Sequence, residues 1–179
     1  MAWNNNVEIF TFENRKYISQ MRPQLFDFEI VLAKAQIYCA YQERCQWEVK
    51  KKLREWQVDD EIQDEIISAL ITQNFINEER FAFQFAGGKF RIKNWGKLKI
   101  KSELKMRQIS NYSINKALNS IADEEYSLTL HKLITKKKKE IEARNTFEKN
   151  QKIGQYLLAK GYESDLVWEA LSLINDDKS

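Results

Sequence analysis

The stretch "IKSELKMRQISNYSINKALNSI", residues 100–121, decides the fold, because its apolar residues mark two short helices joined by a turn. Ile100 and Leu104 stand four residues apart, which is the spacing of one helical face. After Ile109, the apolar residues at 117, 118 and 121 have the i, i+1, i+4 spacing of a second buried face. The stretch therefore predicts a helix, a turn and another helix.

The same six apolar positions recur in two other parts of the chain. Each set follows another stretch with helical patterning, at residues 27–44, 78–93 and 124–144. Three units of about 50 residues, each with three helices, are therefore expected. The aligned residues are Val49, Leu53, Val58, Ile66, Ile67 and Leu70; Ile100, Leu104, Ile109, Ala117, Leu118 and Ile121; and Ile153, Leu157, Tyr162, Ala170, Leu171 and Ile174.

The residues at the expected helix ends support these units unevenly. Gly161 stands where a left-handed residue would end a helix, and Gln57 and Gln108 hold the equivalent positions. Each glutamine would lose about 1 kcal/mol in that conformation, which glycine adopts without strain. Short polar side chains that can accept a hydrogen bond from the first helical turn favour helix starts. The predicted N-caps are Asp59, Ser110, Ser164 and Asn77.

The composition favours a folded, helical protein. Apolar residues make up 43% of the chain and charged residues 31%, whereas five glycines and one proline leave few tight turns for a sheet. We expect an all-α fold, a tandem array of three three-helix repeats forming an elongated, curved molecule. The expected parts are an N-terminal extension at 1–23 and repeats at 24–76, 77–122 and 123–179, the last with a short acidic tail. Within the extension, residues 7–18 alternate loosely enough for a short strand, or form a flexible tail.

Several classes of protein are disfavoured by what the chain lacks. Cys39 and Cys45 lie six apart and His131 is the only histidine, so neither a metal site nor a disulfide framework is expected, and the thiols are predicted to be reduced and buried. No phosphate loop, dinucleotide loop or catalytic triad pattern is present, which argues against an enzyme and against a cofactor. The longest uncharged stretch in the middle of the chain, residues 66–77, is too short to cross a bilayer. A cytoplasmic monomer is the expectation.

Charge is concentrated along the chain although the formal net charge is only +3. Residues 54–85 hold eight acidic and two basic side chains, whereas residues 89–107 hold eight basic side chains and one acidic one. We expect these cations to share one accessible face that contacts an anionic partner, either nucleic acid or an acidic protein surface. The alternative is a solvated face balanced by the acidic unit. The candidate residues are Lys89, Arg91, Lys93, Lys97, Lys99, Lys101, Lys105 and Arg107.

Two further features of the basic sequence have two readings each. Trp95 lies within the basic stretch, where it either stacks on an exposed base or packs in the core. A second basic run near the end of an expected helix either contacts the same partner or interacts with the helix dipole, and Glu140 and Glu142 follow it. The run consists of Lys136, Lys137, Lys138 and Lys139.

Two sequence boxes resemble the RecX family of bacterial recombination regulators. "NEERFA" (77–82) is similar to its Asp-Asp-x-Arg-Phe-Ala box, and "GKLKIKSELKMRQI" (96–109) resembles its Gly-x-x-Lys-Ile-x-x-Glu-Leu-x-x-Lys-Gly-Ile box. The resemblance extends from about Ala33 to about Ile174. Asn77 replaces the first acid, Gln108 replaces the glycine, and Trp47 stands where a serine cap is frequent, which puts local capping in doubt.

The resemblance implies a crescent of three tandem three-helix units that lodges in the helical groove of the RecA nucleoprotein filament. There it would lower the ATPase and strand-exchange activities of RecA, in homologous recombination, DNA repair and the SOS response. The implied partners are the RecA filament, single-stranded DNA and also double-stranded DNA. The family's basic box carries over to Lys97, Lys99, Lys101, Lys105 and Arg107, whereas the other cations rest on charge alone.

Two other functions fit the same residues. One is a general nucleic-acid-binding helical array, whose second or third helices contact duplex DNA. The other is a scaffold that only bridges proteins. Inhibition of RecA at concentrations too low to coat the DNA would separate the regulator from both.

Overall fold

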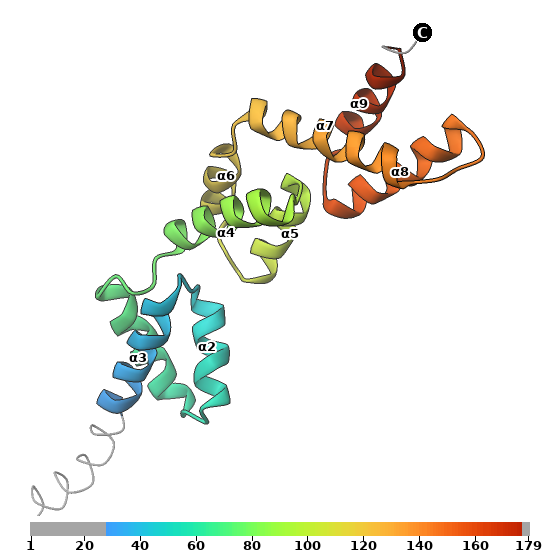
Figure 1. Cartoon of the computed structure of the whole chain (residues 1–179). Helices are drawn as coiled ribbons and strands as arrows, with labels where there is room; N and C mark the ends of the chain where they lie inside the picture. Colours follow the sequence, from blue (N-terminus) through green and yellow to red (C-terminus); the bar gives the residue numbers. More distant parts are fainter. Residues whose placement is uncertain (1–27, 177–179) are drawn as a thin grey trace, which may run out of the picture. The chain divides into compact units, whose positions relative to one another are not determined.

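The computed structural model of the protein describes residues 28–176, with side chains as far as residue 173. Every regular element within this range is an α-helix, and helices and turns alternate along the chain (Figure 1). The all-α prediction is confirmed. The predicted extension at 1–23, with its strand or tail at 7–18, lies outside the described residues.

Two compact units divide the chain, Met1–Ile76 and Asn77–Ser179. In the described part of the first unit, a helix at residues 28–41 precedes α2 (Gln46–Glu55) and α3 (Asp60–Thr72). The three helices pool their apolar faces into one small core, because none of them can bury its own face alone. The buried core residues are Leu32, Ala35, Cys39, Val49, Leu53, Ile66, Ile67, Leu70 and Ile76.

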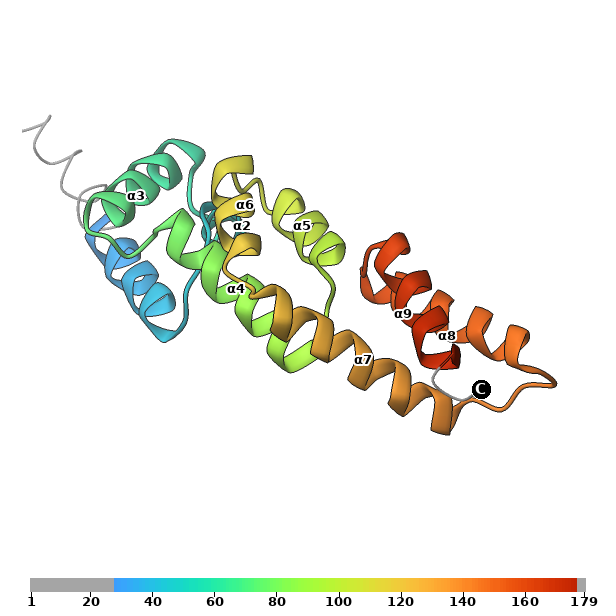
Figure 2. The same ribbon diagram turned by 90° about the horizontal axis from the view of Figure 1, so that it is seen from above.

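The second unit contains helices α4 to α9, which pack in two groups of three (Figure 2). In the first group α4 packs against α5 and α6, and in the second α7 packs against α8 and α9. The prediction of a three-helix repeat array is confirmed, whereas its four-part boundaries stay a prediction. The six helices are α4 (Glu78–Lys93), α5 (Lys97–Met106), α6 (Asn111–Asn119), α7 (Asp123–Glu140), α8 (Thr146–Lys160) and α9 (Ser164–Asp176).

The repeated apolar positions form the cores. Side chains are described for all of the aligned residues except Ile174, and of these all but the half-buried Val58 are buried. Removing such side chains from water is the main favourable contribution to folding, at about 25 cal/mol per Å² of apolar area. The same six positions therefore fix the second and third helices of every repeat.

The turn between the second and third helices is the same in all three repeats. Gln57 and Gln108 have φ of 60° and Gly161 has φ of 88°, so all three adopt the left-handed conformation that was predicted. In each repeat the next residue donates its N–H to the carbonyl of the buried leucine five residues earlier, at 3.1, 3.2 and 3.2 Å. These bonds are those of the Schellman motif, which satisfies the carbonyls at a helix C-terminus.

The predicted N-caps are correct in part. Asn77 accepts from the backbone N–H of Arg80 at 2.9 Å, and Ser110 accepts from that of Ser113 at 3.2 Å. Asp59 stands at the N-cap position but makes no side-chain cap bond. The prediction for Ser164 is wrong by one residue. Since α9 begins at Ser164, the residue equivalent to Asp59 and Ser110 is Glu163, whose carbonyl accepts from Val167.

The predicted burial of the two cysteines is confirmed. Cys39 and Cys45 are both buried and reduced. Burial raises the pKa of the Cys39 thiol to about 11, so this thiol stays protonated at neutral pH. Among the helices of residues 28–176, none is long and apolar enough to cross a membrane.

Candidate binding surface

Helix α5 carries the second sequence box and sorts its residues into rows. Because a helix turns about 100° per residue, residues four apart lie above one another on one side. One row, Ile100 and Leu104, is buried in the core. Three rows remain outside the core: Lys97, Lys101 and Lys105; Leu98, Ser102 and Met106; and Lys99, Glu103 and Arg107. The basic sequence therefore presents three chemically different strips.

The first of these rows, here called the lysine row, consists of Lys97, Lys101 and Lys105. The Nζ of Lys97 donates to Asp123 at 2.9 Å and lies 4.8 Å from the centre of the Tyr126 ring. Lys101 is half-buried and Lys105 is exposed, and neither makes an ion pair with any residue of the described part. Two ammonium groups on one side of α5 are thus left for an external anion.

The opposite flank of α5 belongs to a ladder of alternating cations and aromatic rings, defined by Arg107, Phe85, Lys89, Trp95 and Lys99. Successive members lie 4.8, 5.1, 5.1 and 4.8 Å apart, measured from each cation to the ring centre. Contacts of this kind contribute about 0.5–1 kcal/mol each at exposed sites. The ladder therefore joins α4, the following loop and α5.

The ladder also bears on the two readings of Trp95. The ammonium groups of Lys89 and Lys99 both lie against its half-buried ring. A nucleic-acid base could stack there only after displacing a lysine. Arg107 is held further by a 2.7 Å hydrogen bond to the carboxylate of Glu103. This arrangement favours the packing role of Trp95.

The remaining cations of the stretch, Arg91 and Lys93, lie in the last turn of α4, and Arg91 is on another side of that helix from Lys89. Arg91 follows Lys89 by two residues, which is about 200° around a helix. Its guanidinium lies against Gly87, where an added Cβ would meet it. Lys93 ends α4, and its carbonyl accepts from Lys160 Nζ at 2.8 Å. The expectation of one continuous basic face is therefore wrong, because helical geometry divides the eight cations among several faces.

The second basic run is divided in the same way. Lys137 donates to Glu140 at 2.7 Å and lies 4.5 Å from the centre of the Tyr156 ring, on the inner side of α7. Lys136 lies 3.8 Å from Glu140, and Lys139 is exposed. A shallow depression on α7 is lined by Leu128, His131, Lys132, Thr135, Lys136, Lys139 and Glu140. Sequence reasoning missed Lys132 because it lies outside the run, although its spacing of seven from Lys139 indicates a shared face.

The N-terminus of α5 makes a junction with the third three-helix group. The Gly96 N–H donates to the Lys160 carbonyl at 2.9 Å, and the Leu98 N–H donates to the Gly161 carbonyl at 3.0 Å. The first donors of α5 thereby meet the last carbonyls of α8, so each helix end satisfies the other and their dipoles attract. An added Cβ at Gly96 would collide with the Gly161 backbone, which explains the glycine that opens the second box.

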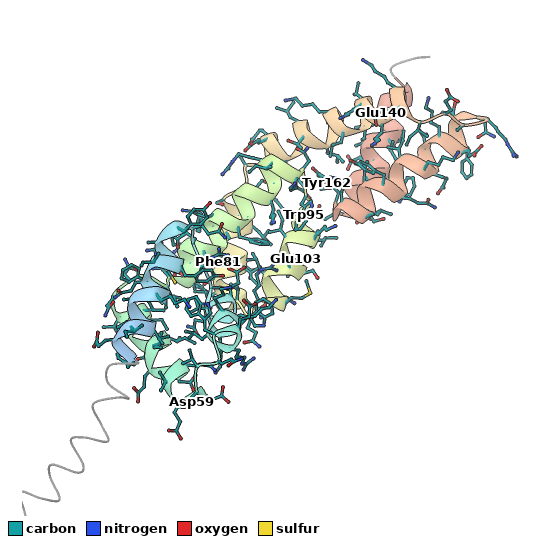
Figure 3. The ribbon with its side chains drawn as sticks, turned by 60° about the horizontal axis from the view of Figure 1, so that its bottom comes forward. Asp59, Phe81, Trp95, Glu103, Glu140 and Tyr162 are labelled. Atoms are coloured by element: carbon teal, nitrogen blue, oxygen red, sulfur yellow. The ribbon has the colours of Figure 1, made fainter. Side chains whose placement is uncertain are left out.

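A tyrosine extends this junction. The Lys97 N–H donates to the Tyr126 hydroxyl at 2.9 Å, and that hydroxyl donates to Glu163 at 2.7 Å. Burial raises the pKa of Tyr126 far above its ordinary value, so the hydroxyl keeps the proton that it donates. The ring of Tyr126 stacks on that of Tyr162 at 5.0 Å. Trp95 and Tyr162, from the two sides of the junction, are labelled in Figure 3. Apart from the glycine at position 96, no sequence pattern predicts this contact.

The first sequence box has a structural role as well. Glu78, its second residue, accepts hydrogen bonds from the hydroxyls of Ser110 and Ser113 and from the Ser110 backbone. Burial raises the pKa of Glu78, but these hydrogen bonds outweigh it and hold the pKa below the ordinary value. The box thus ties the start of α4 to the start of α6.

Comparisons with known proteins agree with these boxes. The family model for the second three-helix domain of RecX matches residues 77–118, and that for the third matches residues 123–171. A regulatory protein RecX from Lactococcus lactis subsp. lactis (strain IL1403) is 32% identical over 148 residues, covering 79% of this chain and 55% of that protein. One from Bacillus thuringiensis (strain Al Hakam) is 27% identical over 141 residues, covering 79% and 52%.

Solved structures agree as well. The crystal structure of RecX from Lactobacillus salivarius superimposes with a TM-score of 0.75 at 25% identity, covering 84% of this chain and 98% of that one. Another regulatory protein RecX gives 0.71 at 26% identity, covering 79% and 72%. The chain spans about half the length of the curated relatives that it matches. Both sequence boxes lie within residues 77–118, which match the second three-helix domain of RecX, and this chain belongs to the RecX family.

Proposed function

We propose that this protein binds in the groove of the RecA nucleoprotein filament and lowers the ATPase and strand-exchange activities of RecA. The observation that carries the proposal is the lysine row on α5. It lies within the second RecX box and leaves Lys101 and Lys105 without an ion pair in the described residues. A repeat array offers an extended surface that suits a helical groove and needs no pocket chemistry.

The proposed role is electrostatic and steric. A chain that occupies the groove would block filament growth or promote disassembly, and it would need neither a catalytic residue nor a cofactor. We place it in the cytoplasm, with single-stranded DNA and double-stranded DNA as further partners.

The test reverses charge only where the structure leaves it unpaired. Lys101→Glu/Lys105→Glu avoids Lys97, which helps to hold α5 at Asp123. We expect this variant to lose inhibition of the single-stranded-DNA-dependent ATPase of RecA, with unchanged helicity by circular dichroism. Arg91→Glu/Lys93→Glu removes the same charge from the same basic sequence, but on α4, and should retain most of the inhibition.

The outcomes separate the candidate functions. Full inhibition by Lys101→Glu/Lys105→Glu would refute the assignment of the lysine row. Equal losses in both double variants would indicate dependence on net charge alone. If the wild-type protein lowered the activity of any DNA-dependent ATPase equally, competition for DNA would explain it, and the general nucleic-acid-binding array would replace the RecA regulator.

A further inference from the structure

The outermost strip of α5 is apolar although basic residues surround it in the sequence. Leu98, Ser102 and Met106 form this strip, which we call the apolar ridge, on the side away from the buried Ile100 and Leu104. Leu98 is 51% exposed and Met106 is 59% exposed. Eight residues separate them, which is about 12 Å along a helix. Both large apolar side chains of α5 outside the core therefore lie in one row.

The charges beside the ridge differ on its two sides. On one side is the lysine row, in which Lys101 and Lys105 make no ion pair within the described residues. On the other side Lys99 and Arg107 are engaged by the rings of Trp95 and Phe85. The ridge is thus bordered by available positive charge along one edge and by a fixed ladder along the other.

We propose that the apolar ridge docks into an apolar hollow on an acidic protein surface, and that the lysine row pairs with the acids beside that hollow. This inference rests on the proposed function, under which the acidic surface belongs to a RecA protomer. It assigns α5 to the protein of the filament and not to the DNA. A phosphate backbone rewards lysines, but it offers no apolar surface against which leucine and methionine lose contact with water.

Charge complementarity favours an acidic partner, and the fold holds the ridge in position before binding. Lysines at the edge of an interface accelerate encounter with an acidic surface and set its register, while apolar side chains at the centre supply affinity. Methionine adapts its shape to a partner. The junction at Gly96 holds the start of α5 and the ladder holds one flank of it, so little conformational freedom of the helix is lost on binding.

A lone exposed leucine or methionine would be ordinary on any protein surface. What distinguishes the ridge is that both side chains share a row beside the unpaired lysines. The chain offers a matched control for this point. Leu166 and Leu173 on α9 are 40% and 54% exposed, near the values for the ridge, and lie seven residues apart on one helix.

The experiment compares binding to filament and to naked DNA. Leu98→Gln/Met106→Gln, Leu166→Gln/Leu173→Gln and the wild type are titrated against RecA assembled on a labelled single-stranded oligonucleotide, and against the oligonucleotide alone, by fluorescence anisotropy. We expect the ridge variant to bind the filament about tenfold more weakly and the naked oligonucleotide within twofold of the wild type. The control variant should match the wild type in both titrations.

Three results would overturn the ridge proposal while leaving the proposed function in place. One is unchanged filament affinity of a ridge variant that is folded by circular dichroism. Another is an equal loss on naked oligonucleotide, which would make the ridge a nucleic-acid contact. The third is an equal loss in the control variant. A wild-type protein that does not inhibit RecA would overturn the proposed function and the ridge proposal together.

Discussion

Helices α2 and α5 occupy the same place in their repeats but present different surfaces. Both have ten residues, and each buries one apolar pair four residues apart. In α2 two of the three lysines are paired within their own unit, since Lys50 donates to Asp64 and Lys52 donates to Glu55, both at 2.8 Å, while Lys51 lies 5.9 Å from the centre of the Trp47 ring. In α5 two lysines remain unpaired in the described residues. The buried row sets the fold, and the outward rows are free to acquire a function.

The two helices also begin differently. The first turn of α2 contains Glu48, whose negative charge suits a helix N-terminus, whereas the first turn of α5 contains no acid. The first donors of α5 instead meet carbonyls of the third three-helix group at Lys160 and Gly161. A helix that depends on a neighbouring repeat for its cap is positioned by that neighbour.

The largest effect is expected from breaking this borrowed cap. Gly96→Ala places a Cβ against the Gly161 backbone, and overpacking together with a lost hydrogen bond should lower the unfolding free energy by about 2–3 kcal/mol. Urea denaturation followed by circular dichroism measures the change. The control is Gly88→Ala in α4, where an added Cβ meets nothing within 4 Å. That substitution should be neutral or stabilising by up to about 1 kcal/mol, and equal losses would contradict the junction.

A smaller effect of opposite sign should appear at the equivalent turns of α2 and α5. Gln57 and Gln108 both have φ of 60°, a conformation that costs a residue with a side chain about 1 kcal/mol more than glycine. We expect Gln57→Gly and Gln108→Gly each to raise the unfolding free energy by about 0.5–1 kcal/mol in urea denaturation. Gln151→Gly, within α8, should instead lower it by a similar amount. If the glycine substitution lowered the unfolding free energy at one of the two turns, the turns would not be equivalent.

The fold could be predicted from the sequence because it depends on periodicity, and periodicity is local. The positions of Ile100, Leu104 and their equivalents follow from one helical face, and burial of that face confirmed them. The lysine row could be predicted for the same reason. Capping was less predictable, as Ser164 shows, because one residue of register decides which side chain reaches the first turn.

The rest of the candidate surface could not be predicted because it depends on contacts distant in sequence. Gly96 meets Gly161, and Arg107 meets Phe85, only when separate helices pack together. A count of charges also does not show which cations are already paired or which face of a helix each one occupies. The basic stretch was therefore expected to form one face, whereas its cations lie on several. The apolar ridge was not predicted because its two large residues, Leu98 and Met106, are interleaved with lysines in the sequence.

The smallest predicted effect concerns the acid sensitivity of the first box, residues 77–82. The unit that contains α2 has no such box. The folded pKa of Glu78 is below the ordinary 4.5, so its hydrogen bonds from Ser110 and Ser113 stabilise the fold fully above about pH 4.5. That stability is lost as the pH falls through the lower folded pKa. Because the carboxylate is partly in water, the contribution should be only about 0.5–1 kcal/mol.

Glu78→Gln tests this sign by urea denaturation between pH 3 and pH 7. The variant should be less stable than the wild type at neutral pH, and the difference should shrink as the pH falls below about 4.5, where the wild-type carboxylate takes up its proton. Glu124→Gln makes the same substitution at an exposed acid of α7 and serves as the control. If the wild type and Glu78→Gln differed by the same amount at every pH, the serine hydroxyls would be bonding to Glu78 without regard to its charge. The link between α4 and α6 would then be neutral, and the acid in the box would not be needed for it.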